Sequence, residues 1–425
     1  MQVITAQRLV VGKGKTVMHN GAVCMENGRI KAVESEEKLR AQYPGTAVSD
    51  YGDATILPGL IDMHLHVGDT QSRPDVEQGG PLMRILFAAW ELSCALKRGV
   101  TTVRDVASEK GVCVSLRQAA EMGLLRIPRI FTSGPAFAMS GGHAWMLESV
   151  TEVNGPWKLC EDVRSNIRDG ADWIKIMADG VGKPEYTQEE LNAAVTECHR
   201  RGRKAAVHAS MEEAIGMCIE AGFDTIEHGI FMTPEQARRM AEKGIAWVPT
   251  AAVCTKIARQ LEEMLSERGL DAAGLAPENV DLYLTLQRQT NPAADLRGLT
   301  AEELRRALYY RSVRAAYRER LKRYLDMGVT VLAGTDMVIG GTVPAPVEEE
   351  IACLAEYGLT VVEAIEAATG SAAQVLGLEG QAGTLEPGSS ADILVVKGDA
   401  SRDAAALSNT LQVFQNGQAV LSGTK

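Results

Sequence analysis

The sequence predicts an α/β protein in which a barrel of alternating strands and helices carries a small β domain built from both ends of the chain. Three observations support this prediction. The middle alternates apolar, strand-like runs with amphipathic ones, whereas both ends contain only short strands and turns. Histidines and an aspartate also stand where several central strands should end. Functional groups are therefore expected at one rim of the barrel.

The two ends of the chain are predicted to form one β-sandwich domain from residues 1–56 and 377–425. Turn signals such as Asn27-Gly28 and Asn416-Gly417 separate their apolar runs. Strands are expected at 3–6, 22–25, 29–33, 392–396, 412–414 and 419–421.

Residues 57–376 are predicted to form a closed, TIM-like (β/α)8 barrel. Between most strands lie amphipathic stretches, and Thr187 with Glu190 has the spacing of a helix capping box. Active sites of such barrels lie at the C-terminal ends of the strands. The strand candidates are 60–66, 100–105, 128–133, 171–177, 203–208, 224–228, 245–249 and 329–335.

A helical insertion at about 250–326 interrupts this alternation. Long helices are expected near 252–268 and 300–326, with a stretch containing Pro and Asn at 276–297 between them. The insertion follows the seventh strand at the catalytic face. It is either a lid or oligomer contact, or an extra helical hairpin packed on the side of the barrel.

Composition narrows the possible partners and compartment. The chain has 425 residues, of which 45% are hydrophobic and 23% charged, and its net charge is −11. That charge disfavours nucleic acid and anionic membranes as partners. The eight cysteines form no CxxC pair, no secretory leader is visible, and no apolar run approaches 18 residues. We expect a cytoplasmic enzyme acting on a small-molecule substrate.

The run PGLIDMHLH at 58–66 contains the most informative pair of residues. Side chains two apart on a strand point the same way, so His64 and His66 leave the first strand together and can bind one metal ion. Further candidate ligands end or lie within later strands. They are Lys175 in the fourth, His208 in the fifth, His228 in the sixth and Asp336 in the eighth.

These six residues predict a binuclear metal centre. His64, His66 and Asp336 are expected to hold the more buried ion, and His208 and His228 the more exposed one. Imidazole and carboxylate ligands suit Zn²⁺, with Mn²⁺, Co²⁺ or Fe²⁺ as alternatives. Two ions lower the pKa of a bridging water and polarise a carbonyl, so hydroxide can attack an amide. Asp336 is expected to pass a proton to the departing amine.

Lys175 is expected to bridge the two ions as a carbamate. A lysine in an Ile/Trp/Met strand is costly to bury as an ammonium ion, and nearby cations depress its pKa further. The neutral amine can then capture carbon dioxide and become N6-carboxylated, an anionic bidentate ligand. The alternative is a lysine that reaches solvent or pairs with Asp172 or Asp179.

Several motifs together resemble the amidohydrolase superfamily over essentially the whole chain. Besides PGLIDMHLH they are WIKIM at 173–177, AVHA at 206–209, IEHG at 226–229, AGTD at 333–336 and GTLEPGSSADILV at 383–395. SGGH at 140–143 is similar to the branch of prolidase-like Xaa-Pro dipeptidases, Xaa-Arg/Lys carboxypeptidases and an ochratoxin amidase. The resemblance implies hydrolysis of a peptide-type amide next to a free carboxylate.

Residues around the predicted centre have two possible interpretations each. The resemblance implies that His143 contacts the substrate carbonyl and stabilises the oxyanion; otherwise it is an exposed loop histidine. Arg73, Lys183 and Tyr186 are candidates for binding the substrate carboxylate, although solvated charges are the usual explanation. Arg104 is expected to pair structurally near Asp105 or with Glu227. His199 should lie on the barrel exterior, and His19 in the β domain.

Two other functions compete with this interpretation. A cyclic amidohydrolase resembling imidazolonepropionase, or a deaminase, would use one metal and lack the bridging lysine, so Lys175 argues against it. A non-enzymatic scaffold would have lost ligands, whereas all six are present. The resemblance further implies a homo-oligomer of unknown order.

Overall fold

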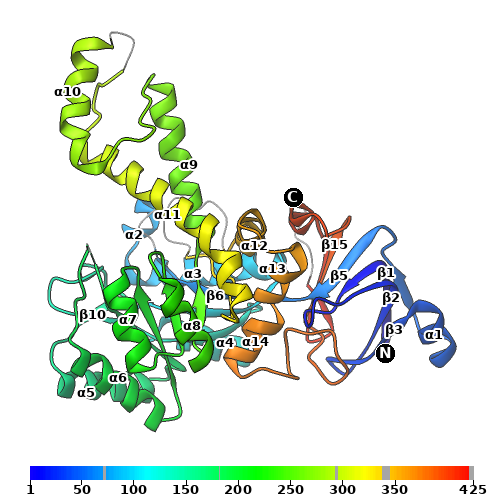
Figure 1. Ribbon diagram of the computed structural model, residues 1–425. Helices are drawn as coiled ribbons and strands as arrows, with labels where there is room; N and C mark the ends of the chain where they lie inside the picture. The colour runs from blue at the N-terminus through cyan, green and yellow to red at the C-terminus, as the bar shows by residue number, and fades with distance from the viewer. Residues whose placement is uncertain (70–72, 181, 292–294, 337–344, 421–425) are drawn as a thin grey trace.

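A computed structural model describes residues 1–69, 73–180, 182–291, 295–336 and 345–420. Figure 1 shows an α/β body with a β-rich end that contains the first and last strands and, on the opposite side, a projecting helical arm. The candidate site lies in the body, where parallel strands end.

The two chain ends share a single eight-stranded sheet in the order β17-β16-β15-β5-β1-β2-β3, with β4 paired to β1. β15 runs antiparallel to β5, which joins the C-terminal segment to the N-terminal one. The described strands form one hydrogen-bonded path, so the predicted two-layered sandwich is not confirmed. The strands are β1 (Gln2–Val10), β2 (Val17–Glu26), β3 (Arg29–Ser35), β4 (Val48–Asp50), β5 (Ala54–Pro58), β15 (Ile393–Lys397), β16 (Thr410–Gln415) and β17 (Gln418–Val420).

Two Asn-Gly turns shape this sheet as the sequence predicted. Asn27 and Gly28, and likewise Asn416 and Gly417, all have positive φ angles, the conformation that tight hairpin turns require. The predicted last strand at 419–421 runs one residue beyond the described part of the chain.

The body contains two parallel sheets. One has the order β6-β7-β8 and the other β10-β9-β11-β12-β13-β14. β9 and β10 were not predicted; β9 pairs with β11 through Phe137 and Ile176. The strands are β6 (Leu60–Leu65), β7 (Val100–Asp105), β8 (Arg129–Thr132), β9 (Ala136–Ala138), β10 (Val150–Glu152), β11 (Trp173–Met177), β12 (Lys204–Ala209), β13 (Thr225–His228) and β14 (Ala246–Val248).

The eighth predicted strand, at 329–335, is not a regular strand. It makes one isolated parallel bridge, from Val331 to Trp247. Ala333 N–H donates to the Ala367 carbonyl, and Ile61 N–H donates to the Ala368 carbonyl. These carbonyls at the end of a helix replace some of the hydrogen bonds that a regular strand at 329–335 would form with β6. Single hydrogen bonds, such as Met63 N–H to the Ala333 carbonyl, connect this stretch to β6. A continuous closed barrel is therefore not confirmed by the strand pairing.

Helices cover the parallel sheets. Their apolar faces pack on the strands; in α6, for example, Leu191, Ala194, Val195 and Cys198 are buried. The predicted capping box of Thr187 and Glu190 is present at its start. The helices outside the insertion are α1 (Glu36–Gln42), α2 (Pro74–Glu77), α3 (Gly80–Lys97), α4 (Val112–Glu121), α5 (Pro156–Arg168), α6 (Gln188–Arg200), α7 (Glu212–Ala221), α8 (Pro234–Lys243), α12 (Val347–Glu356), α13 (Val361–Ala367), α14 (Gly370–Leu376) and the 3₁₀ helix η2 (Ala404–Ser408).

The insertion forms a projecting arm whose outer part stands clear of the body (Figure 1). It contains α9 (Ala251–Glu267), the 3₁₀ helix η1 (Pro277–Asn279), α10 (Val280–Thr290) and α11 (Ala301–Asp326). The outer part has its own core, which includes Leu265, Leu284 and Leu304. At the base, Tyr317 of α11 donates to the Pro249 carbonyl at 2.7 Å. The arm is thus a helical hairpin anchored on the body near the seventh strand.

Among the described residues, no helix combines the length and apolarity needed to cross a membrane. All eight cysteines are free thiols, as their scattered spacing predicted.

Candidate metal centre

The structure brings the predicted ligands to neighbouring strand ends. His64 lies in β6 and His66 directly follows it, while His208 and His228 lie at the ends of β12 and β13. Ring centroids of His64 and His228 are 5.2 Å apart, and those of His208 and His228 are 4.5 Å apart. The strand-end pattern therefore corresponds to one cluster in space.

His64, His66 and Asp336 form the tightest part of this cluster. Their ligand atoms all lie within 4.8 Å of one another. Asp336 Oδ1 is 3.5 Å from His64 Nε2 and 3.3 Å from His66 Nε2. Two imidazoles and a carboxylate that converge in this way could hold a divalent ion.

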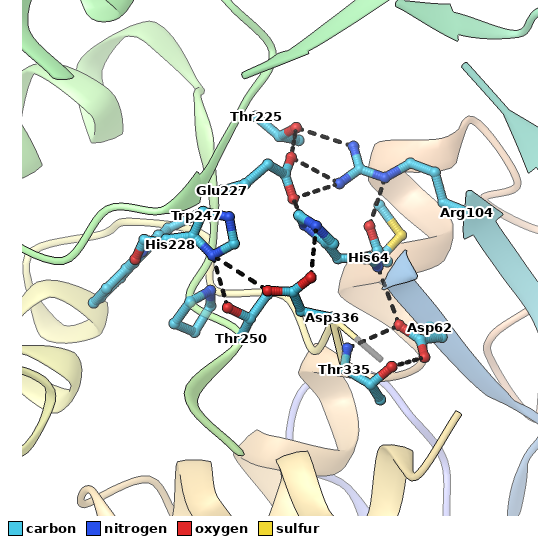
Figure 2. Close-up of polar contacts among 12 residues, drawn as sticks. Asp62, His64, Arg104, Thr225, Glu227, His228, Trp247, Thr250, Thr335 and Asp336 are labelled. Atoms are coloured by element: carbon cyan, nitrogen blue, oxygen red, sulfur yellow. Dashed lines mark hydrogen bonds and ion pairs between the residues drawn. The ribbon is translucent and has the colours of Figure 1, made fainter. Parts of the chain in front are cut away.

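A buried ion pair orients His64 (Figure 2). Glu227 Oε2 is 2.7 Å from His64 Nδ1, and Arg104 Nη2 donates to both oxygens of Glu227 at 2.8 and 3.0 Å. With Nδ1 engaged, Nε2 is the nitrogen left to face Asp336. The predicted pairing of Arg104 with Glu227 is confirmed. The positioning role of Glu227 was missed, although its place beside His228 in a buried strand could have suggested it.

Asp62 holds the backbone around the cluster through hydrogen bonds, a role that the sequence analysis did not predict. It accepts hydrogen bonds from His64 N–H at 3.1 Å, from Thr335 N–H at 3.0 Å and from the Thr335 hydroxyl at 2.6 Å. These contacts join β6 to the segment that carries Asp336, as Figure 2 shows. A carboxylate two residues before a histidine on the same strand was the available signal.

The second group of histidines is less closely held. His208 Nε2 lies 3.4 Å from Asp179 Oδ1, an oxygen without a hydrogen bond among the described residues. His228 Nδ1 lies 2.9 Å from the Thr250 hydroxyl and 3.9 Å from Asp336 Oδ2. Because His208 lacks a close hydrogen-bonding partner, its orientation depends more on packing.

Three residues at the strand ends have backbone conformations that are unusual for non-glycine residues. The φ angles are 65° at His228, 49° at Thr250 and 50° at Asp336. Such positive values are costly for residues with a Cβ and cluster at functional sites. Here they direct side chains toward a common centre.

Lys175 is buried in β11, with 1% of its surface exposed. Its Nζ makes no hydrogen bond with any described residue. Neither carboxylate proposed as an alternative partner forms an ion pair with it among the described residues: Asp172 accepts from Arg117 at 2.6 Å, and Asp179 accepts from the Ser210 and Met211 N–H groups through Oδ2, while its Oδ1 lies 3.4 Å from His208 Nε2. Burial lowers the pKa of Lys175 to about 8. A neutral amine is therefore accessible near physiological pH.

Burial also keeps three of the four ligand histidines, all but His66, in the form that binds metals. It lowers the pKa of His64 to about 4 and that of His228 to about 3, and it holds the pKa of His208 well below its usual value. Burial tends to raise the pKa of Asp336, but the neighbouring histidines hold it far below its usual range. Burial also acts to lower the pKa of His66, but the contact with Asp336 outweighs it and raises that pKa. Three neutral imidazoles, His66 and an ionised carboxylate are a donor set that fits Zn²⁺, which displaces the His66 proton on binding.

His143 lies beside this donor set on an exposed loop. Its ring stacks on that of His208, with centroids 4.1 Å apart. Its backbone N–H donates to Glu185 at 2.8 Å. Arg84 of α3 forms ion pairs with Glu148 of the same loop and, at 2.8 Å, with Glu109. The loop is thereby fixed against the helix that follows the first strand.

The predicted carboxylate-binding residues have different environments. The Tyr186 side chain is 3% exposed, and its hydroxyl donates to the Val153 carbonyl. Arg73 forms two hydrogen bonds with Asp75, at 2.9 and 2.6 Å. Lys183 is exposed on the loop after β11. His199 pairs with Asp224 on the surface, as expected.

Comparison with known proteins places this geometry in a family. The family model described as "Amidohydrolase family" matches residues 55–420. A crystal structure of an Xaa-Pro dipeptidase with bound methionine in its active site has a TM-score of 0.80 and 28% identity, and the match covers 99% of each chain. Ochratoxinase from Aspergillus niger is 27% identical over 98% of this chain and 84% of its own length. Imidazolonepropionase from Geobacillus kaustophilus is 27% identical over 89% and 84%.

These similarities agree with the α/β fold, its parallel sheets and its histidine-rich strand ends. Structures of this family are of the TIM-barrel type, and its members generally bind divalent metal ions. The chain therefore belongs to the amidohydrolase family and is a hydrolase that acts on carbon–nitrogen bonds.

Proposed function

We propose that the protein is a binuclear metal-dependent amidohydrolase that cleaves the amide bond of dipeptides or N-acyl amino acids, of the Xaa-Pro or Xaa-Arg/Lys type. The observation that carries this proposal is Lys175: a fully buried lysine without a described hydrogen-bonding partner, on the strand beside His208. An amine in that position is suited to become a carbamate and not to remain an ammonium ion.

Two Zn²⁺ ions are the proposed cofactors. His64, His66 and Asp336 would hold one, His208 and His228 the other, and N6-carboxylated Lys175 would bridge them. When bound, such ions supply a hydroxide nucleophile at neutral pH and polarise the amide carbonyl.

The chain's own residues then have distinct tasks. Asp336 Oδ2 would accept the proton of the attacking water and deliver it to the departing amine. His143, stacked on His208, would donate an N–H to the carbonyl oxygen as negative charge develops there. Lys183 is the best candidate for binding the substrate carboxylate, because Tyr186 is buried and Arg73 is paired with Asp75.

The second candidate is a one-metal cyclic amidohydrolase of the imidazolonepropionase type. The 27% identity to such an enzyme and the compact group of His64, His66 and Asp336 favour it. It leaves the burial of Lys175 without an explanation.

The free cysteines are compatible with the cytoplasm, which we propose as the location of the protein.

One experiment separates the two candidates. Zinc-loaded protein is analysed for metal per chain and incubated with Xaa-Pro, Xaa-Arg and Xaa-Lys dipeptides, N-acyl amino acids and imidazolonepropionate. We expect two zinc ions per chain and release of free amino acids. One ion per chain with turnover of imidazolonepropionate alone would favour the second candidate. Two ions with no release from any carboxylate-bearing amide would refute the substrate class only.

A further inference from the structure

Helix α3 exposes an apolar stripe along its outer face. Leu82, Leu86 and Trp90 follow one another at four-residue spacing and are 78%, 65% and 51% exposed; the adjoining Met83 is 44% exposed. The opposite face of the helix is buried through Ala88, Leu92, Ala95 and Leu96. A surface helix of a monomer normally has polar residues on its outer face, so this stripe has the composition of an interface.

We propose that this stripe, Leu82, Met83, Leu86 and Trp90, is a dimer interface, on which α3 of a second copy of the chain packs antiparallel. In a two-fold symmetric contact, residue i of one copy meets residue j of the other, and j meets i. With the axis at Leu86, Leu82 lies opposite the partner's Trp90 and Leu86 lies opposite its own copy. Each Trp then meets a smaller Leu, and no two Trp side chains compete for the same space.

The size of the stripe fits a second copy. From the exposed fractions, its four side chains offer roughly 500 Å² of apolar surface per copy, compared with about 800 Å² per partner in a standard interface. Trp145 and Met146, 47% and 68% exposed, add apolar surface on a neighbouring loop. They belong to the loop that the ion pair between Arg84 and Glu148 ties to α3.

The helix dipoles also favour an antiparallel partner of identical sequence, because antiparallel pairing sets opposite ends of the two α3 dipoles side by side. The acidic residues before the N-terminus of α3 are paired within the chain, Asp75 with Arg73 and Glu77 with Arg84, so the contact depends on the apolar stripe.

The arm offers a competing surface and thereby a matched control. Leu282 of α10 is 60% exposed, close to the 65% of Leu86, and is also leucine on a helix. Leu286 of the same helix is 46% exposed. A substitution of Leu282 tests whether any exposed leucine supports assembly or only the stripe on α3.

The test measures the mass of the full-length, metal-loaded chain by sedimentation and light scattering at micromolar concentration. Because Leu86 faces itself across the axis, both Leu86→Arg and Leu86→Glu should halve the mass of the assembly. An equimolar mixture of these two variants should restore the wild-type mass, since opposite charges then meet at the axis. Leu282→Arg should leave the mass unchanged.

Other outcomes overturn the proposal. A wild-type chain that is monomeric under these conditions would refute it. An unchanged mass in both Leu86 variants would also refute it. Dissociation by Leu282→Arg alone would assign the interface to the arm. Failure of the mixed Leu86 variants to reassociate, with each still folded by circular dichroism, would exclude the antiparallel contact at Leu86.

Discussion

His64 and His208 are both buried imidazoles at strand ends, but their surroundings differ. His64 Nδ1 is 2.7 Å from Glu227, which is itself held by Arg104. The only polar contact of His208 with a described side chain is at 3.4 Å, to Asp179, and its ring stacks on that of exposed His143. One half of the candidate centre is thus fixed by hydrogen bonds, and the other mainly by packing.

This difference indicates how the two metal positions depend on the protein. In the proposed centre, the first position has three side-chain ligands besides the bridging carbamate, namely His64, His66 and Asp336. The second position would have only His208 and His228 besides that carbamate, and a lysine amine becomes an anionic bridging ligand only after reaction with carbon dioxide. We therefore expect the first position to bind metal more tightly, and the second to be sensitive to pH and carbon dioxide.

Replacing Lys175 should produce the largest effect. Lys175→Ala should lose the second metal ion while retaining the first, and kcat/KM should fall about a thousandfold, roughly 4 kcal/mol. Metal content and turnover are measured on the same samples. Added acetate should restore part of the activity by supplying a small carboxylate.

The matched control is Lys204→Ala, on the neighbouring strand, where the Lys204 ammonium donates to the Val375 carbonyl. It should keep both metals. A Lys175→Ala protein that retains two ions and full turnover would contradict the proposed bridging role of Lys175.

Glu227→Gln tests the better-held half. Loss of the charge that orients His64 should weaken metal binding at the first position about 10- to 100-fold, as is typical for partners of metal-bound histidines. Competition with a chelator measures the affinity. The change also leaves Arg104 buried without its partner, so Arg104→Met/Glu227→Gln is prepared in parallel to separate metal affinity from stability. Unchanged affinity in both proteins would contradict the positioning role.

Lys183→Met tests substrate binding without touching either half. KM for a carboxylate-bearing amide should rise about tenfold, or roughly 1.4 kcal/mol, with kcat unchanged. Arg73→Met, which loses a local pair with Asp75 and a cation–π contact with Phe87, is the matched control. An equal rise in KM for both variants would indicate a general charge effect and not a contact.

The pH dependence of activation should show the smallest effect. With the pKa of Lys175 at about 8, the neutral fraction of the amine grows as pH rises toward that value. At fixed dissolved carbon dioxide, metal-free protein given zinc should regain activity roughly fivefold faster at about pH 8 than at about pH 7. A rate of activation that is independent of pH would show that activation does not depend on deprotonation of Lys175.

Sequence reasoning found the side chains that follow strands but not their supports. His64 and His66 were predicted because strand periodicity fixes where side chains point, and His208 and His228 because they stand at the ends of strands. The hydrogen bond from Thr335 to Asp62 joins residues distant in the sequence, so a local pattern could single out Asp62 but not its partner. The stretch at 329–335 has a strand-like composition, yet the carbonyls of Ala367 and Ala368 replace some of the hydrogen bonds that a strand there would form with β6. Tyr186 was proposed for the substrate because loop position alone does not indicate that its hydroxyl turns inward.

Thr250 links backbone strain to a trade-off between stability and activity. As a β-branched residue at φ 49° it is costly for the fold, by about 1–3 kcal/mol, and a glycine would relieve that cost. The same substitution would release His228 Nδ1 from the threonine hydroxyl. Selection for heat resistance alone would therefore favour glycine at this position, and the more durable protein would be the poorer catalyst.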